Sequence, residues 1–213
     1  MISSALLAST TGRMAVAGIA LALGLASGCA RQVVRIAPEQ AIDLSGRWND
    51  VDSRLVADAL IHQSFESSAG QSWAVRHTQR SGGERPTVIV GGLRNRTLEH
   101  VPVGTFVRDL ERAYINTGLV NVVASDVERQ EIRDEREDQQ VYASATNRAQ
   151  LRQETGADYM LQGEIQSIED REAGRSVVFY QVDVTLTDLE TNNRVWVGQH
   201  KIKKFIDRPR LGL

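Results

Sequence analysis

The sequence predicts an α/β domain in which helices flank one mixed sheet of four or five strands, with an antiparallel meander at its C-terminal end. In the first two thirds of the chain, apolar residues alternate between helical spacing and short β-branched runs, as in β–α units. In the last third they recur at every second residue between turns, which is typical of antiparallel strands. The share of charged residues, 24%, is that of an ordinary globular domain.

The first 28 residues are typical of an export signal. An apolar stretch rich in Ala, Leu and Gly covers 14–26, and it is shorter than the roughly 18–20 residues that a membrane-spanning helix needs. Small residues then precede Cys29, as in the lipobox of bacterial lipoproteins, although Leu25 stands four residues before the cysteine rather than three. We therefore expect residues 1–28 to be a lipoprotein signal peptide that is removed.

Cys29 is the only cysteine of the chain, so we expect it to be the lipidation site rather than a buried free thiol. Ala30 is not the aspartate that retains many lipoproteins in the inner membrane, which favours the periplasmic face of the outer membrane. Two or more acyl chains give stable anchoring. Residues 29–44 have no periodicity and are interpreted as a short lipid-anchored tether, and 45–213 as the periplasmic domain.

A first helix is expected over residues 51–60, where apolar residues recur with helical spacing and Asn49 or Asp50 can cap the N-terminus. Residues 66–85 are rich in Ser, Gly and Arg and are expected to be a loop. The β-branched run 86–91 predicts a buried strand, with a tight turn at its two glycines; a phosphate-binding loop lacks its motif there.

Pro102 is expected to begin a second helix and Gly118 to end it, and a brief strand follows near Val122. Residues 126–140 carry many acids and arginines, so we predict a solvated helix or a mobile excursion; docking of a basic partner is the alternative. A further helix is expected over 145–155.

Three late strands are expected over residues 159–165, 178–186 and 194–202, where apolar residues alternate with polar ones. Turn-forming residues at 170–174 and 191–193 separate them. The strands therefore form the antiparallel meander.

No catalytic, cofactor or metal site is predicted. The four histidines have no ligand spacing, and no Gly-x-Ser-x-Gly segment accompanies them. Without Arg13, the one basic residue of the signal, the net charge falls from −2 to −3, which gives no reason to expect nucleic acid as a partner, since that would need a basic surface. We expect neither nucleic acid nor a small-molecule substrate as a ligand.

The region from about Ser45 to Phe205 resembles the LpoB-type activators of penicillin-binding proteins. Three segments carry the resemblance: Gly46-Arg47-Trp48-Asn49-Asp50-Val51-Asp52-Ser53-Arg54; Arg85-Pro86-Thr87-Val88-Ile89-Val90 with Asn95-Arg96-Thr97; and Gly156-Ala157-Asp158-Tyr159-Met160-Leu161-Gln162-Gly163-Glu164-Ile165. A helix, turn and strand like the third segment also occur in curli-secretion-like and TolB N-terminal-like modules. A periplasmic envelope-assembly or secretion accessory is therefore the alternative function.

The resemblance implies an outer-membrane lipoprotein without enzyme activity that binds a bifunctional, class A penicillin-binding protein and stimulates peptidoglycan synthesis. Arg47 and Trp48 are the candidate partner-binding residues, because arginine and tryptophan are enriched at interface hot spots. Packing of Trp48 against the first helix is the alternative. The best-known members of this family have a long proline-rich tether, whereas this chain has a single proline, Pro38, in a short one.

Overall fold

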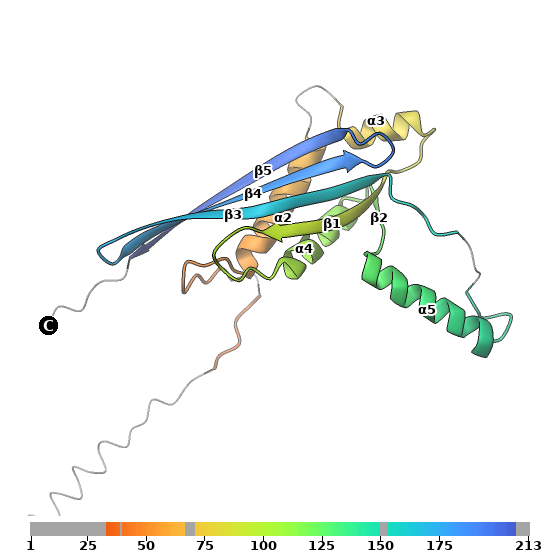
Figure 1. The fold of residues 1–213 in the computed structure, drawn as a ribbon, viewed down its shortest axis with the longest axis horizontal. Coiled ribbons are helices and arrows are strands. Elements are labelled where there is room, and N and C mark those ends of the chain that lie inside the picture. Colours follow the sequence, from red (N-terminus) through yellow and green to blue (C-terminus); the bar gives the residue numbers. More distant parts are fainter. Residues whose placement is uncertain (1–32, 39, 67–70, 150–152, 208–213) are drawn as a thin grey trace, which may run out of the picture. The chain divides into compact units, whose positions relative to one another are not determined.

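A computed structural model describes residues 33–38, 40–66, 71–149 and 153–207. The chain divides into two units, Met1–Gln40 and Ala41–Leu213. In the first unit the described residues form neither helix nor strand. The second unit contains all the described helices and strands (Figure 1). Among the described residues, no helix combines the length and the apolar character needed to cross a bilayer.

The second unit is a five-stranded mixed sheet with helices packed on one face, which confirms the predicted α/β class. The strands are β1 (Thr87–Asn95), β2 (Asn121–Val122), β3 (Tyr159–Glu172), β4 (Arg175–Asp188) and β5 (Arg194–Asp207). Their order is β2-β1-β3-β4-β5. β1 runs parallel to both of its neighbours, whereas β3, β4 and β5 form the predicted antiparallel meander.

The helices are α2 (Asp50–Phe65), α3 (Trp73–Arg80), α4 (Val103–Thr117) and α5 (Asp126–Tyr142). α2 and α4 contact each other and pack against the same sheet face, α2 on β5 and α4 on β1 (Figure 1). A reciprocal capping box between Asn49 and Asp52 starts α2, and Gly118 ends α4 in the left-handed conformation. Both ends lie where the sequence places them.

The expectation of a loop throughout residues 66–85 is wrong, because α3 lies within it. The Ser72 hydroxyl accepts a hydrogen bond from the Val75 N–H at the start of α3. Trp73 and Ala74 are buried on the core side, and the Trp73 ring stacks on Phe65 at 5.6 Å between centroids. Packing of an aromatic residue thus stabilises a helix whose polar composition suggested a loop.

The expected tight turn at Gly91 and Gly92 is also wrong. β1 continues through both glycines to Asn95, and its register against β3 shifts between Val90 and Leu93. A Cβ on Gly91 would lie 3.1 Å from Cγ of Met160, so β1 and β3 approach closely here. The glycines therefore form an irregular part of the strand rather than its end.

Residues 145–149 and 153–155 are turn and irregular chain, so the helix expected over 145–155 is wrong for its described part. Side chains of α5 satisfy the backbone there: Gln140 donates to the Ala149 carbonyl at 2.9 Å, and the Ala149 N–H donates to Gln139. α5 itself is the predicted solvated helix, because none of its residues is buried.

The three meander strands are longer than expected, with fourteen residues each. β3 and β4 continue to Glu172 and Arg175, and Ala173 and Gly174 make the turn between them with φ values of 47° and 87°. The residues of β3 and β4 closest to this turn contribute side chains to the candidate site.

Candidate functional site

The turn 45–48 determines where the two predicted partner-binding residues lie. Gly46 has a φ of 72°, and its N–H donates to Oδ1 of Asp43 at 2.9 Å. A Cβ at this position would collide with the side chain of Ile206, and the left-handed backbone also favours glycine. The turn places Arg47 on the surface and directs Trp48 into the core.

Trp48 is 8% exposed and makes contacts that account for its whole side chain. Its indole N–H donates to the Ser53 hydroxyl at 2.7 Å. The ring meets Phe106 and Tyr180 edge-on, with centroids 5.8 and 5.6 Å apart. The indole therefore packs as the alternative interpretation expected. Contact of the Arg47–Trp48 pair with a partner stays a prediction, and it now centres on Arg47.

Glu99 connects the turn 45–48 to strand β4. Its carboxylate accepts hydrogen bonds from the Tyr180 hydroxyl at 2.6 Å and from the backbone N–H of Trp48 at 3.2 Å. Burial, together with the Glu99 carboxylate, raises the pKa of Tyr180 above its usual range. Asn95 and Thr97 form the turn that positions Glu99: Nδ2 of Asn95 donates to the Glu99 carbonyl at 2.7 Å, and the Thr97 N–H donates to Oδ1 of Asn95.

Lys204, on β5, also stabilises the turn 45–48. Its ammonium lies 2.7 Å from the Asp43 carboxylate and 2.6 Å from that of Asp52, and it also donates to the Arg47 carbonyl. Burial favours neutral Lys204, but the hydrogen bonds to the two carboxylates outweigh it and raise the pKa of Lys204. The pKa of Asp43 is lowered, since Lys204 and the Gly46 N–H outweigh the opposing effect of burial.

A cleft of about 330 Å³ opens between this turn and the tip of the β3–β4 hairpin. Charged side chains of both signs line it: Arg47, Glu99, Glu169, Arg171, Glu172 and Arg175. Arg171 is paired with Glu169, and Arg175 lies 3.9 Å from Asp207. The Arg47 guanidinium forms no hydrogen bond or ion pair with any described residue. It is therefore available to bind an external carboxylate through two parallel hydrogen bonds.

The third resemblance segment has a structural role at the other end of the sheet. The Asp158 carboxylate accepts a hydrogen bond from the Thr87 N–H at 2.7 Å, which joins β1 to the start of β3. The Tyr159 hydroxyl lies 3.0 Å from Nδ1 of His77 and accepts a hydrogen bond from Arg80. Burial raises the pKa of Tyr159, although Arg80 opposes the shift. These contacts hold α3 against β3.

Of the predicted site residues, Cys29 lies outside the described residues, and Arg47 and Trp48 lie side by side on opposite faces of their turn. Sequence reasoning missed the residues that hold this turn, Glu99, Tyr180 and Lys204. Lys204 belongs to a group that the sequence does mark, since the three lysines of the chain all lie within residues 201–204. Within the described ranges, no three His, Cys, Asp or Glu residues are grouped as metal ligands.

Fold and site together define a mixed α/β domain whose candidate site offers charged groups for recognition. The model of one family, described as peptidoglycan-synthase activator LpoB, matches residues 52–202. The chain therefore belongs to the LpoB family of peptidoglycan-synthase activators, whose role is regulatory. The matched region begins after Arg47 and Trp48, so membership says nothing about those two residues.

Several solved structures resemble the chain at low sequence identity. The LpoB C-terminal domain from Escherichia coli is 16% identical, over 72% of this chain and 99% of that one, with a TM-score of 0.41. The corresponding Salmonella enterica domain is 14% identical, over 74% and 99%, with a TM-score of 0.37. Lipoprotein GNA1162 from Neisseria meningitidis is 13% identical, over 59% and 88%, with a TM-score of 0.37. Comparison with curated protein sequences gives no match.

Proposed function

We propose that this chain is a lipid-anchored, non-catalytic activator of a bifunctional, class A penicillin-binding protein. The observation that carries the proposal is the family match over residues 52–202. A protein without catalytic groups accelerates an enzyme by binding its active conformation more tightly than its resting one. A coupling of about 1–3 kcal/mol corresponds to roughly 5–150-fold.

The proposed location is the periplasmic face of the outer membrane, with a lipid on Cys29. The export signal, the small residues before Cys29 and the absence of aspartate at position 30 support it. The eleven residues from 30 to 40, which precede the second unit, span at most about 40 Å when extended. Contact then requires that the synthase extends toward the outer membrane or that the two membranes lie close together; an anchor in the inner membrane is the alternative.

We assign the contact with the synthase to the surface around Arg47. The turn that presents this residue is held rigidly by Gly46, Glu99 and Lys204, so little conformational freedom is lost on binding. The Arg47 guanidinium, which has no partner among the described residues, fits a carboxylate of the synthase. The burial of Trp48 gives it a supporting role beneath this surface.

The test of activation uses the full chain in detergent together with a class A penicillin-binding protein from the same organism. We expect the synthase to be retained by the immobilised chain and its glycan polymerisation to accelerate within the 5–150-fold range given above. The chain alone should neither polymerise nor hydrolyse peptidoglycan. If the folded chain neither retains nor stimulates any such synthase, the proposal is wrong and the envelope-assembly accessory becomes the better hypothesis.

The role of Arg47 is tested with Arg47→Ala, and Arg148→Ala serves as a matched control on the irregular segment after α5. We expect Arg47→Ala to weaken synthase binding about tenfold without changing the melting temperature, because its side chain has no described partner within the domain. The control should bind like the wild type. Equal binding by both variants would move the contact away from this turn.

Lipidation is tested by metabolic labelling with palmitate. The wild-type chain should take up label and partition into detergent, and Cys29→Ala should do neither, because it removes the only thiol of the chain. Label retained in the variant would exclude Cys29 as the acylated residue.

A further inference from the structure

The outer edge of β5 has no strand beside it among the described residues. β5 is the last strand of the sheet and pairs with β4 along its whole length, from Arg194 to Asp207. No described strand pairs with its other edge. An exposed edge of this length presents a row of main-chain donors and acceptors, which an extended segment of another chain can complete.

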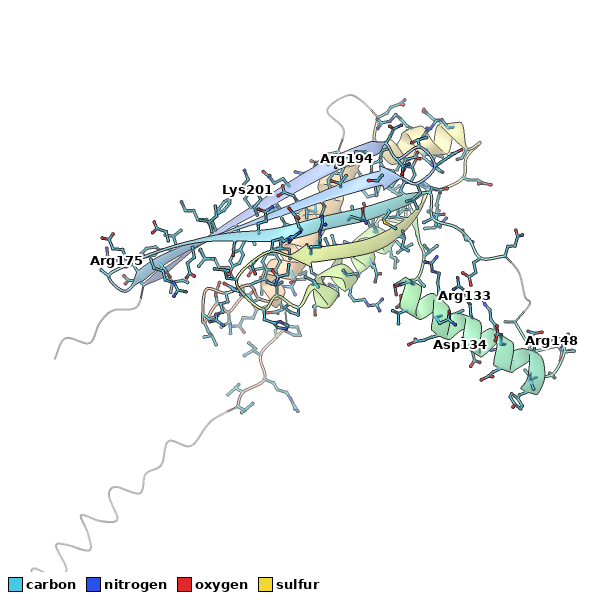
Figure 2. All side chains as sticks on the ribbon, viewed as in Figure 1. Arg133, Asp134, Arg148, Arg175, Arg194 and Lys201 are labelled. Carbon is cyan, nitrogen blue, oxygen red and sulfur yellow. The ribbon has the colours of Figure 1, made fainter. Side chains whose placement is uncertain are left out.

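The lysines of this protein are concentrated on that strand. All three, Lys201, Lys203 and Lys204, lie on β5, and the other 22 basic residues are arginines. Lys204 faces α2, where it is paired with Asp52. Lys201 and Lys203 are exposed on the opposite face and form no ion pair with a described residue. Figure 2 shows Lys201 at the β5 border of the sheet.

Apolar side chains flank the two exposed lysines on the same face. Val197 and Phe205, which are 62% and 65% exposed, lie at even spacing from Lys201 and Lys203 along β5, and alternation places all four together. On β4, Phe179 lies opposite Lys203. With Gln199 between Val197 and Lys201, the order along this face of β5 is apolar, polar, basic, basic, apolar.

That face continues onto β3 as an apolar patch. Ile168, which is 69% exposed, pairs with Phe179, and Val177 pairs with Phe205. Residues directly opposite in antiparallel strands share a face, so these four side chains are neighbours. An added strand next to β5 would extend the patch by one row.

We propose that the free edge of β5 is the docking strand for an extended acidic segment of the synthase. The segment would carry two acidic side chains two residues apart, beside Lys201 and Lys203, with an apolar residue near Phe205. Opposite charges on adjacent strands attract and the main chains pair, so alternation provides the specificity. This inference rests on the proposed function, because it names the synthase as the source of the segment.

A second copy of this chain fits the edge poorly. Antiparallel pairing of two β5 strands about Ile202 would place Lys201 opposite Lys203 of the other copy, and like charges directly opposite destabilise a sheet. Lysines on an edge strand are a common protection against self-pairing. The charge pattern thus rejects a second copy and favours an acidic strand.

The first test is acetylation of lysine amines followed by mass spectrometry, with the full chain alone and with bound synthase. Lys201 and Lys203 should react in the free chain and react at least fivefold more slowly in the complex. Lys204 is an internal control, because its side chain is 10% exposed and paired in both states. Unchanged reactivity of Lys201 and Lys203 in a saturated complex would overturn the proposal.

The second test compares binding of the synthase by two variants of equal net charge. Lys201→Glu with Lys203→Glu should weaken binding at least tenfold, and raising the salt concentration should weaken wild-type binding. Arg85→Glu with Arg148→Glu, both exposed and away from β5, should bind like the wild type. Melting temperatures verify that both variants fold.

The outcomes separate this inference from the proposed function. If the wild-type chain neither binds nor stimulates the synthase, both fail. If the wild type binds and the β5 variant binds equally well, only the edge inference fails. Self-association gained by the variant in sedimentation, with synthase binding retained, would show that the lysines only protect the edge.

Discussion

At the scale of single residues, a buried network holds the turn that carries the candidate site. Trp48 rests between Phe106 and Tyr180, and the Glu99 carboxylate accepts hydrogen bonds from the Tyr180 hydroxyl and from the Trp48 backbone. The exposed Arg47 is therefore positioned by neighbours that are buried or half-buried. A change in the network alters stability first and binding second.

Trp48→Ala should lower the free energy of unfolding by about 3–5 kcal/mol, because it leaves a cavity and removes two aromatic contacts. Urea titration at pH 7 measures this value. Trp48→Phe should lose less, since it keeps a ring but leaves the Ser53 hydroxyl without its indole partner. Weaker synthase binding by Trp48→Ala with unchanged unfolding would instead give the indole a direct interface role.

The Lys204 cluster makes stability depend on pH in two windows. Its pKa is raised above the usual 10.5, so its contribution is complete below that value and is lost as the pH rises through the folded-state pKa. The pKa of Asp43 is lowered below the usual 3.8, so its contribution is present above that value and is lost as the pH falls through the folded-state pKa.

Lys204→Met should cost roughly 3 kcal/mol at pH 7, because Asp52 keeps a nearly buried carboxylate without its cation. The variant should also lose less stability than the wild type when the pH is raised above about 10.5, since it lacks the amine that titrates. Urea midpoints at pH 7 and in alkaline buffer give both values. Parallel alkaline losses in the two proteins would contradict the assigned role.

At the scale of elements, close approach of strands determines where glycine is required. Gly163 of β3 lies opposite Val184 of β4, and a Cβ there would meet Cγ1 of Val184 at 2.7 Å as well as the carbonyl of Asp183. Gly92 of β1 has no atom within 4 Å of the corresponding position. Two glycines in neighbouring strands thus have different tolerance of a methyl group.

Gly163→Ala should destabilise the domain by about 2 kcal/mol, because the extra methyl group forces β3 and β4 apart. Gly92→Ala is the control and should change the free energy of unfolding by less than about 1 kcal/mol. Thermal and urea unfolding measure both. A neutral Gly163→Ala would show that the strands separate at little cost.

At the scale of the whole molecule, the second unit includes residues that the sequence assigned to the tether. It begins at Ala41, and Asp43 within it contacts Lys204 and Gly46. The apolar stripes of α2 and α4 and the inner faces of the meander bury one another within this unit. The unit therefore contains its own core.

A chain that starts at Ala41 should unfold cooperatively in solution, because its core does not involve the preceding residues. A chain that starts at Ser45 should also fold but be less stable by about 0.5–1 kcal/mol, since it lacks the partly exposed Asp43–Lys204 pair. Urea titrations of the two chains give the difference. Equal stability would return residues 41–44 to the tether.

The sequence alone determined the α/β class, the ends of α4, which alternate residues of the meander strands face the core, and the resemblance to LpoB-type activators. These features depend on local periodicity and on short-range chemistry such as capping and turn formation. Tertiary structure decided the rest. It buried Trp48, made α3 a helix through the packing of Trp73, continued β1 through two glycines and left residues 145–149 irregular. Each of these depends on which distant residue covers a side chain or accepts a backbone hydrogen bond, and local pattern does not encode such long-range partners.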